Sequence, residues 1–174
     1  RYTAAKAHAD SVKLYGFDST DFELSLSSVD FMINTASSGP ALDFKTGYDL
    51  PTGAQSVRLD MSGKTIGASL SNATLHSGDF VHVSGSFAFE KGGTLALSAR
   101  TVGGVHLPVL ADAFTLGASH VQAFVGVGGP YRTDSNLDGR ITTADAVANP
   151  NAIGLVIDDF SFGLGLFQDR VLGT

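Results

Sequence analysis

The sequence contains no cysteine and no tryptophan. Without cysteine the chain can form neither a disulfide nor a thiolate metal site, and cysteine usage gives no information on the redox compartment. Charged residues are scarce: they make up 16% of the chain, against about 25% in an average globular protein. The 17 acidic and 11 basic residues are spread without blocks, so no basic stripe is available to a phosphate backbone. We therefore expect no nucleic-acid partner.

Long hydrophobic runs are absent as well. Gly, Ser, Asp or His interrupts the apolar stretches every few residues, far short of the roughly 18 residues that cross a bilayer, so we expect no membrane span. The chain begins with Arg1 and shows no signal peptide, which is typical of a processed product or of a segment of a longer protein. At 174 residues, a single domain over 1–174 is the expected organisation.

Glycine, with 21 residues, is abundant, which predicts many turns and few helices. The dominant pattern is an alternation of apolar and polar residues, which places the two sets on opposite faces of a β-strand. The clearest example runs over 81–89 and ends at 91–93, Lys-Gly-Gly, where we expect a turn. About ten strands are predicted, among them 12–14, 22–26, 57–61, 66–70, 81–89, 95–99, 121–127 and 160–166.

The phase of this alternation changes within the predicted strand that begins at Phe22. Between Leu26 and Val29 the apolar positions switch from even to odd numbers, which predicts a bulge or a bend between two sheets. The expected fold is therefore all-β: an antiparallel β-sandwich or rolled sheet, with a β-solenoid-like stack as the alternative. The Ala-rich segment 2–10 is compatible with either a helix or a strand.

Residues 134–145 match a calcium-binding loop. A 12-residue loop of this kind supplies oxygen ligands from positions 1, 3, 5, 7, 9 and 12, the seventh through a backbone carbonyl. Position 6 is Gly139, where the chain must turn sharply, and position 8 is the apolar Ile141, which anchors the loop to the core. We therefore predict a Ca2+ site with these ligands: Asp134, Asn136, Asp138, the carbonyl of Arg140, Thr142 and Asp145.

Position 12 departs from the usual pattern. Asp145 stands in place of the more common Glu and reaches one methylene less far, so we expect a tighter loop or a bridging water. Two alternatives remain open: an ordinary polar surface turn, because Asn, Asp and Gly are common turn residues, and a hard cation other than calcium. The turn alternative explains neither Ile141 nor Asp145.

The flanks of this loop predict a static role. A calcium sensor needs a helix on each side of the loop, whereas the strand-like run 121–127 precedes this one and no second loop is visible. After the loop, 142–148 is compatible with one or two helical turns before Asn149-Pro150 ends them. The pattern is that of a structural clip.

The remaining His, Ser, Glu and Tyr residues do not form a pattern typical of a zinc site, a catalytic site or a sugar-binding site. The five histidines lack the close spacing on one strand face that a zinc site requires, and a turn separates His76 from His82. No Ser lies in a strand-to-helix elbow, and Glu23 and Glu90 are the only glutamates. Four tyrosines without tryptophan make a poor platform for stacking sugars. No catalytic site is predicted.

Several segments carry a resemblance: 121–131 (VQAFVGVGGPY), the loop 134–145, 149–155 (NPNAIGL), 159–166 (DFSFGLGL), 80–91 and 2–7 (YTAAKA). Together they resemble a unit that very long bacterial surface or secreted proteins carry in many tandem copies, and the likeness covers nearly the whole chain. The loop is also similar to dockerin repeats, which place Asp at position 12 but pair two loops with helices in a shorter chain. The resemblance implies modules strung end to end, each stiffened by calcium.

The predicted function is that of a non-catalytic, extracellular structural module, a calcium-stabilised repeat of a bacterial surface protein, fibre or filament. Neighbouring copies are the expected partners, and the Gly-rich run 160–167 is the expected docking edge, because exposed edge strands pair readily with other chains. The alternatives are an adhesin domain that binds a ligand or a surface glycan, and a hydrolase.

Overall fold

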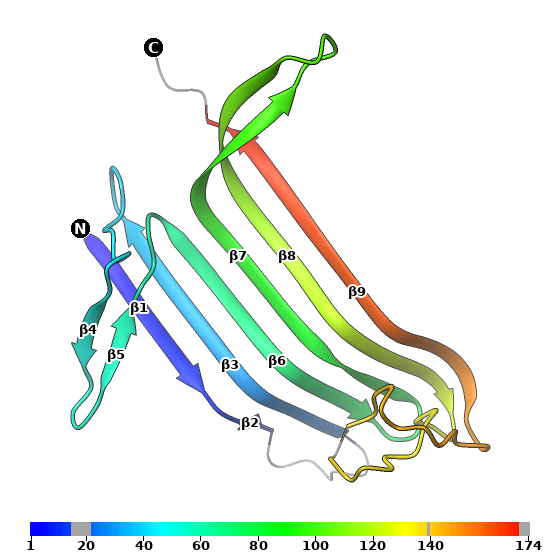
Figure 1. Ribbon diagram of the computed structural model, residues 1–174. Coiled ribbons are helices and arrows are strands. Elements are labelled where there is room, and N and C mark those ends of the chain that lie inside the picture. The colour runs from blue at the N-terminus through cyan, green and yellow to red at the C-terminus, as the bar shows by residue number, and fades with distance from the viewer. Residues whose placement is uncertain (15–21, 139, 171–174) are drawn as a thin grey trace.

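The computed structural model describes residues 1–14, 22–138 and 140–170, which form nine β-strands and no helix (Figure 1). The all-β prediction is thus confirmed, and the Ala-rich N-terminal segment is a strand. The strands are β1 (Tyr2–Ala9), β2 (Val12–Lys13), β3 (Phe22–Ala36), β4 (Tyr48–Pro51), β5 (Ser56–Leu59), β6 (Thr65–Ser77), β7 (Val81–Arg100), β8 (His106–Val127) and β9 (Ile153–Asp169).

Seven strands form one large sheet in the order β1-β3-β6-β7-β8-β9, with β2 paired to β3, and β4 and β5 form a separate hairpin. Every pairing is antiparallel, which confirms the expected strand direction and does not fit a solenoid-like stack. Among the described residues no second sheet of similar size packs on the first, so the sandwich expectation is not met. The sheet is open, with β1 and β9 as its edges.

Strand β7 is longer than the sequence predicts. Lys91-Gly92-Gly93, expected as a turn, is a bulge within β7, and the strand continues to Arg100. Gly92 has φ 128°, and a Cβ there would collide with the carbonyl of Lys64, the residue directly before the neighbouring strand β6. Gly92 is therefore needed for a close approach of the chain, and the two glycines do not end β7.

The predicted phase change in β3 belongs to a row of irregularities that crosses the sheet. Register shifts occur between Leu70 and Ala73, between Ser84 and Ser86, and twice between Ala118 and Ala123. Positive φ angles mark the same level at Asn72 (51°), Gly85 (154°), His120 (51°) and Asp159 (53°). The strands curve together toward the end that carries segment 128–152 (Figure 1), as expected where bulges increase local twist.

The bulges keep one side of the sheet apolar along its whole length. We call the side that carries segment 128–152 the loop face, because Ser84 and Gln122 reach that segment from it. The register and the alternation of side chains place the following residues on the opposite side, the apolar face: Ala5, Ala7, Leu24, Leu26, Val29, Phe31, Ile33, Ile66, Ala68, Leu70, Leu75, Val81, Val83, Phe87, Phe89, Phe114, Leu116, Ala118, Val125, Leu155, Ile157, Phe160, Phe162, Leu164 and Leu166.

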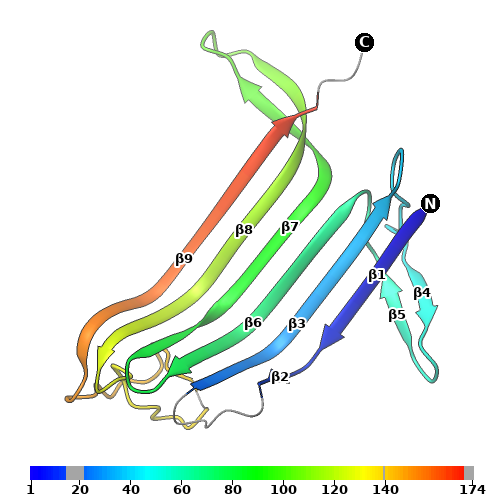
Figure 2. The same ribbon diagram turned by 180° about the vertical axis from the view of Figure 1, so that it is seen from behind.

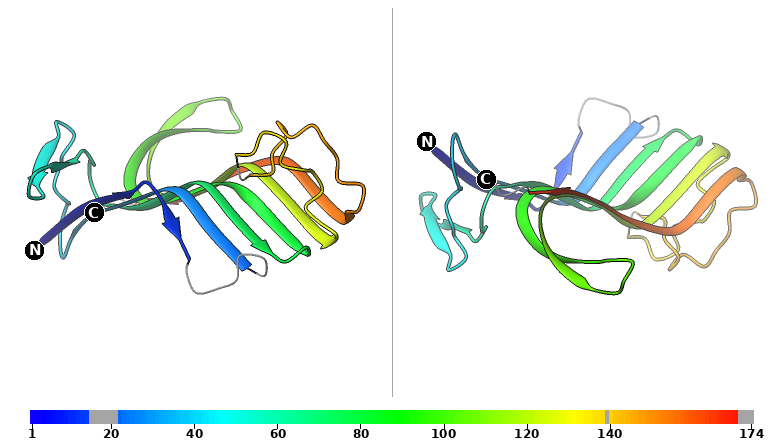
Figure 3. Two further views of the ribbon diagram at one scale, coloured as in Figure 1. Left: turned by 90° about the horizontal axis from the view of Figure 1, so that it is seen from below. Right: turned by 90° about the horizontal axis from the view of Figure 1, so that it is seen from above.

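Three excursions of the chain lie on the loop face. The segment that contains β4 and β5 is held there by Asn34, which donates to the carbonyls of Leu42 and Gly63, and by the ion pair between Lys6 and Asp60. The tip of the β7–β8 hairpin curls to the same side as segment 128–152 (Figure 3). Figure 2 looks onto the apolar face, and no described segment crosses in front of its strands.

The core is correspondingly small. The buried apolar residues of the described chain are Leu59, Met61, Ala111, Ala113, Ala118 and Phe124. Phe124, only 1% exposed, lies on the loop face, and its ring fills the space above Gly126, Gly129 and Gly154.

Candidate functional site

Segment 128–152 joins β8 to β9 and folds back over the loop face. Its two arms are tied together by Asn149, whose Nδ2 donates to the carbonyls of Gly128 and Pro130 at 2.8 Å each. It is fastened to the sheet by Ser84, whose hydroxyl donates to the carbonyl of Ile141 at 3.1 Å. The predicted anchor position 8 therefore does contact the sheet, and does so through its backbone.

The first three predicted calcium ligands converge within the loop. The backbone N–H of Asp138 donates both to Oδ1 of Asp134, at 3.2 Å, and to Oδ1 of Asn136, at 3.0 Å. The Oδ1 of Asp138 in turn accepts from the backbone N–H of Arg140 at 2.9 Å. Oxygens from positions 1 and 3 thus accept hydrogen bonds from one backbone amide, and Nδ2 of Asn136 donates to Oδ2 of Asp138 at 3.1 Å.

Asp145, predicted as position 12, is fully buried. One carboxylate oxygen accepts from the backbone N–H and the hydroxyl of Ser135, at 2.9 and 3.2 Å, and the other accepts from the N–H of Thr142 at 2.9 Å. Burial alone would raise the pKa of Asp145, but these hydrogen bonds outweigh it and hold the pKa below its ordinary value. The carboxylate is therefore charged and closes the loop from its far end.

The other predicted positions of the loop are Arg140, Gly139 and the segment that starts at Thr142. Arg140 contributes its carbonyl in the prediction, and its side chain contacts Oδ1 of Asn72 on β6. Gly139, the predicted sharp turn, lies outside the described residues. The helical turns expected over 142–148 are not formed: Thr142 instead closes a single turn, its hydroxyl accepting from the N–H of Ala144 and its carbonyl from that of Asp145.

The donor set suits calcium in kind, because it offers carboxylate, amide, hydroxyl and carbonyl oxygens without nitrogen or sulfur. Within the described residues, however, no three side chains of His, Cys, Asp or Glu lie close enough together to hold a metal ion. Half of the predicted ligands are of other kinds: the amide of Asn136, the hydroxyl of Thr142 and the carbonyl of Arg140. The calcium site remains a prediction.

Tyr131 and Arg132 clamp the incoming arm of the loop to the sheet. Arg132 donates from Nη2 to Asp158 on β9 at 2.8 Å and from Nη1 to the carbonyl of Asp145 at 2.9 Å. The hydroxyl of Tyr131 lies 3.0 Å from both Oε1 of Gln122 and Oδ1 of Asp158. Position 12 of the loop and strand β9 are therefore linked through one guanidinium group.

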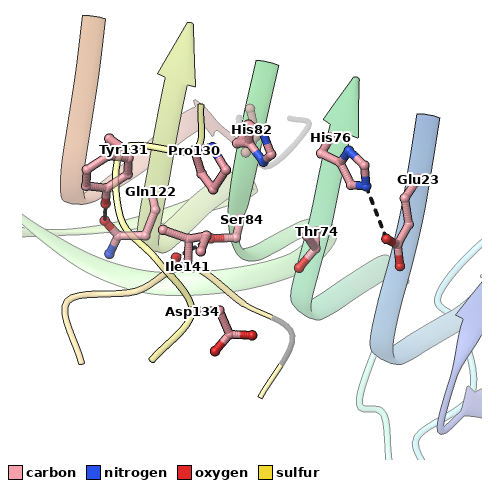
Figure 4. Close-up of a pocket in the computed structure, with 11 residues that line it drawn as sticks. Glu23, Thr74, His76, His82, Ser84, Gln122, Pro130, Tyr131, Asp134 and Ile141 are labelled. Atoms are coloured by element: carbon pink, nitrogen blue, oxygen red, sulfur yellow. Dashed lines mark hydrogen bonds and ion pairs between the residues drawn. The ribbon is translucent and has the colours of Figure 1, made fainter. Parts of the chain in front are cut away.

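A pocket of about 230 Å3 opens on the loop face beside these residues (Figure 4). Its floor consists of side chains from four adjacent strands, and Pro130, Tyr131, Asp134 and Ile141 contribute from the loop side. His76 lies 3.2 Å from Glu23 on β3 and stacks on His82 of β7, with ring centroids 5.4 Å apart. Nδ1 of His76 and Nε2 of His82 are buried without a hydrogen-bond partner.

The pairing of His76 with His82 corrects the sequence analysis, which gave the histidines no common face. The two residues are direct cross-strand partners because they flank the β6–β7 turn symmetrically. Their equal distance from Asp79 in the sequence was the signal that could have revealed the pair. Burial, and then the neighbouring His76, lower the pKa of His82, so this ring favours its neutral form.

The chain matches no protein-family model, and no curated protein and no solved structure resembles it closely enough to count as a match. The described residues contain no helix that is long and apolar enough to cross a membrane.

Proposed function

We propose that this chain is a non-catalytic structural module in which residues 134–145 bind calcium and fasten segment 128–152 onto the sheet. The observation that carries the proposal is the buried, charged carboxylate of Asp145, which faces into a loop where the oxygens of Asp134 and Asn136 already converge. A hard cation would draw the carboxylates of the loop closer together and neutralise them, and calcium accepts such a mixed set of oxygens.

The surroundings of the loop support a clip and not a switch. Strands β8 and β9 flank segment 128–152, and no described residue of it is helical. The exposed binding groove that opens in calcium sensors needs a pair of helices, so this loop has no such element to move. Through Arg132, Ser84 and Arg140 the loop contacts β9, β7 and β6, so its closure would stiffen this end of the sheet.

An extracellular setting, in a tandem-repeat protein of a bacterial surface, fibre or filament, forms part of the proposal. Its support is the sequence resemblance, together with the affinity expected of such a site. Single loops of extracellular modules bind calcium with dissociation constants of about 10⁻⁴–10⁻³ M and stay filled only where calcium is plentiful. A dissociation constant below micromolar would remove this argument for the location.

Calorimetric titration of the chelator-treated chain with calcium tests the proposal. We expect one site per chain, weaker binding of magnesium, and loss of binding in Asp134→Ala and Asp138→Ala. Asp169→Ala is the matched control, because Asp169 is an exposed residue at the end of β9. At 100 times the dissociation constant calcium should stabilise the fold by about 2.7 kcal/mol. No heat at 10 mM calcium together with unchanged unfolding would refute the calcium clip.

A ligand-binding adhesin is the second candidate, favoured by the pocket beside the loop with its two unpartnered ring nitrogens. At about 230 Å3 the pocket is smaller than the roughly 300–1,000 Å3 of typical ligand sites, which places this candidate second. Binding on a glycan array that is lost in His76→Ala would favour it over the structural module.

A further inference from the structure

We propose that the apolar face of the sheet is an interface, and that its occupant is a second copy of this chain packed face to face. Domains are built from at least two layers of secondary structure around a shared core. Here the described residues supply one large layer, whose three excursions all lie on the loop face. No part of the chain that the structure describes supplies a second layer on the apolar face.

The solvent-exposed area of the chain is larger than that of a compact monomer of the same mass. The chain exposes 11502 Å2 for a mass of 18.0 kDa, whereas a compact monomer of this mass exposes about 8,000 Å2. Interfaces of permanent dimers bury about 2,000–5,000 Å2 in total, counted over both partners. The surplus of one chain is therefore large enough for its share of such an interface.

The exposed side chains on this face are large and apolar. On β9 alone Phe162 is 41% exposed, Leu164 44% and Leu166 56%. Phe31 and Leu116 extend the same surface across β3 and β8. Soluble monomers rarely leave apolar patches larger than a few hundred Å2 uncovered, and larger ones mark interaction sites.

The chemistry of the face favours a second copy over an unrelated partner. Among the described residues, charged groups enter it at the hairpin end alone, with Lys91, Asp112 and Arg170, so the rest of the face offers no charge pattern for recognising a different protein. Large and small residues alternate from strand to strand, as with Phe87 opposite Ala118 and Phe89 opposite Ala68, which provides projections and recesses on the same surface. A two-fold axis brings such a surface onto itself, and two twisted sheets pack face to face about 10 Å apart.

This arrangement differs from edge pairing through β9, which the sequence suggested. The described part of β9 pairs on one side only, with β8, and all its residues are exposed, so it also has a free edge. Edge pairing would leave the apolar face uncovered, however, and would not account for the surplus area. The face-to-face proposal does not rest on the calcium site, which lies on the opposite side of the sheet.

Analytical ultracentrifugation of the full chain, with calcium and with a chelator, tests the proposal. We expect a species of twice the chain mass at micromolar concentration. Leu116→Lys should weaken the dimer at least tenfold, and Thr115→Lys, its neighbour on the loop face of β8, should leave it intact. A monomer at 100 μM in both conditions would overturn the proposal. So would a dimer that tolerates Leu116→Lys but is lost with a proline in β9, or a monomer that partitions onto lipid vesicles.

A second measurement covers the case in which Leu116→Lys does not fold. Because the chain has no cysteine, Leu116→Cys and Thr115→Cys each introduce a single thiol, and neither side chain is larger than the one it replaces. Maleimide labelling should be slow at Leu116→Cys and accelerate on dilution, while labelling at Thr115→Cys stays fast throughout. Equal and concentration-independent rates at the two positions would contradict the interface.

Discussion

The imidazole ring of His76 stacks on that of His82 across the β6–β7 hairpin, nearly parallel at 8° and with centroids 5.4 Å apart. Glu23 contacts the outer ring, and Phe124 lies against the inner one at 6.3 Å. One side of the pair thus faces a carboxylate and the other an aromatic ring of the small core. Two protonated rings at this distance would repel each other, and this repulsion is, after burial, the second cause that lowers the pKa of His82.

The first prediction is a loss of stability in mild acid through His82. Burial and the neighbouring His76 lower the pKa of His82 below its ordinary value of 6.5, so below pH 6.5 the unfolded chain binds a proton that the folded chain resists. Urea unfolding with a chelator present should show falling stability as the pH drops from 7 toward 5. His82→Gln should flatten this slope.

His8 provides a control of opposite sign. Asp30, and then Asp10, raise the pKa of His8 above 6.5 by hydrogen bonding, so its contribution to stability is present below pH 6.5 and is lost as the pH rises through the higher, folded value. His8→Gln should therefore make the acid loss steeper, where His82→Gln makes it shallower. The same slope in both variants and in the unmodified chain would contradict the assignment.

The second prediction concerns two glycines of one strand. A Cβ on Gly154 would collide with the carbonyl of Val125 and lie 2.7 Å from Cα of Gly126, whereas a Cβ on Gly163 meets nothing within 4 Å. Gly154→Ala should destabilise the fold by about 1–3 kcal/mol through overpacking. Gly163→Ala should be neutral or stabilise it by up to about 1 kcal/mol. Midpoints of urea unfolding that are equal for the two variants would contradict the close packing under Phe124.

The third prediction separates the two roles of Asp145. Asp145→Asn turns one acceptor of the buried carboxylate into a donor that faces the N–H of Ser135 or Thr142. A buried group left without its hydrogen bond costs about 1–3 kcal/mol, so this variant should be less stable than the unmodified chain even with a chelator. It should also lose the stabilisation by calcium. Asp169→Asn, which is exposed, should change neither quantity.

A variant with unchanged stability in chelator would show that the hydrogen bonds of Asp145 contribute nothing, whatever calcium does. A variant that keeps the full calcium effect would exclude Asp145 as a ligand. Thermal unfolding with and without calcium reads out both quantities in one series.

The strands were predictable because alternation depends only on which residues are apolar. The change of phase after Leu26 predicted a bulge or a bend. Strand β3 keeps its register with β6 there, and the register shifts lie between the neighbouring strand pairs at the same level. The sequence could not rule out a sandwich, because the same alternation at Phe162 and Leu164 results whether the apolar side meets a second sheet of this chain, another chain or solvent. The alternation shows that one side of the sheet is apolar, but it does not show what packs against that side.

The contacts within the loop could be expected from the sequence, because they join residues that are close together along the chain. The loop from Asp134 to Asp145 is a matter of spacing along 12 residues, and the hydrogen bonds within it need no distant partner. The tie from Arg132 to Asp158 and the stacking of His76 on His82 depend on strand register, which alternation alone does not fix. The helical turns expected after Thr142 did not form, because a tight turn at Ala144 brings the chain to the buried Asp145.

The last prediction concerns Asn34, which is fully buried in β3. Its Nδ2 donates to the carbonyls of Leu42 at 2.6 Å and Gly63 at 2.8 Å, and its Oδ1 has no partner. Asn34→Leu keeps the branched shape and the number of side-chain heavy atoms but leaves two carbonyls unsatisfied, which should cost about 2–3 kcal/mol. Asn34→Asp should cost more at pH 7, because a carboxylate would face two carbonyl oxygens.

The pH dependence of Asn34→Asp distinguishes this hydrogen bonding from simple packing. Burial next to two acceptors should raise the pKa of the introduced carboxyl in the folded state, since only its protonated form can donate to a carbonyl. The unfolded chain then releases its proton first as the pH rises, so the variant should be most stable in acid and lose stability toward neutral pH. Asn151→Asp, on an exposed residue, should show no such trend. Urea unfolding of both variants between pH 4 and 7 measures the difference, and parallel curves would mean that Asn34 holds the β4–β5 segment by its shape alone.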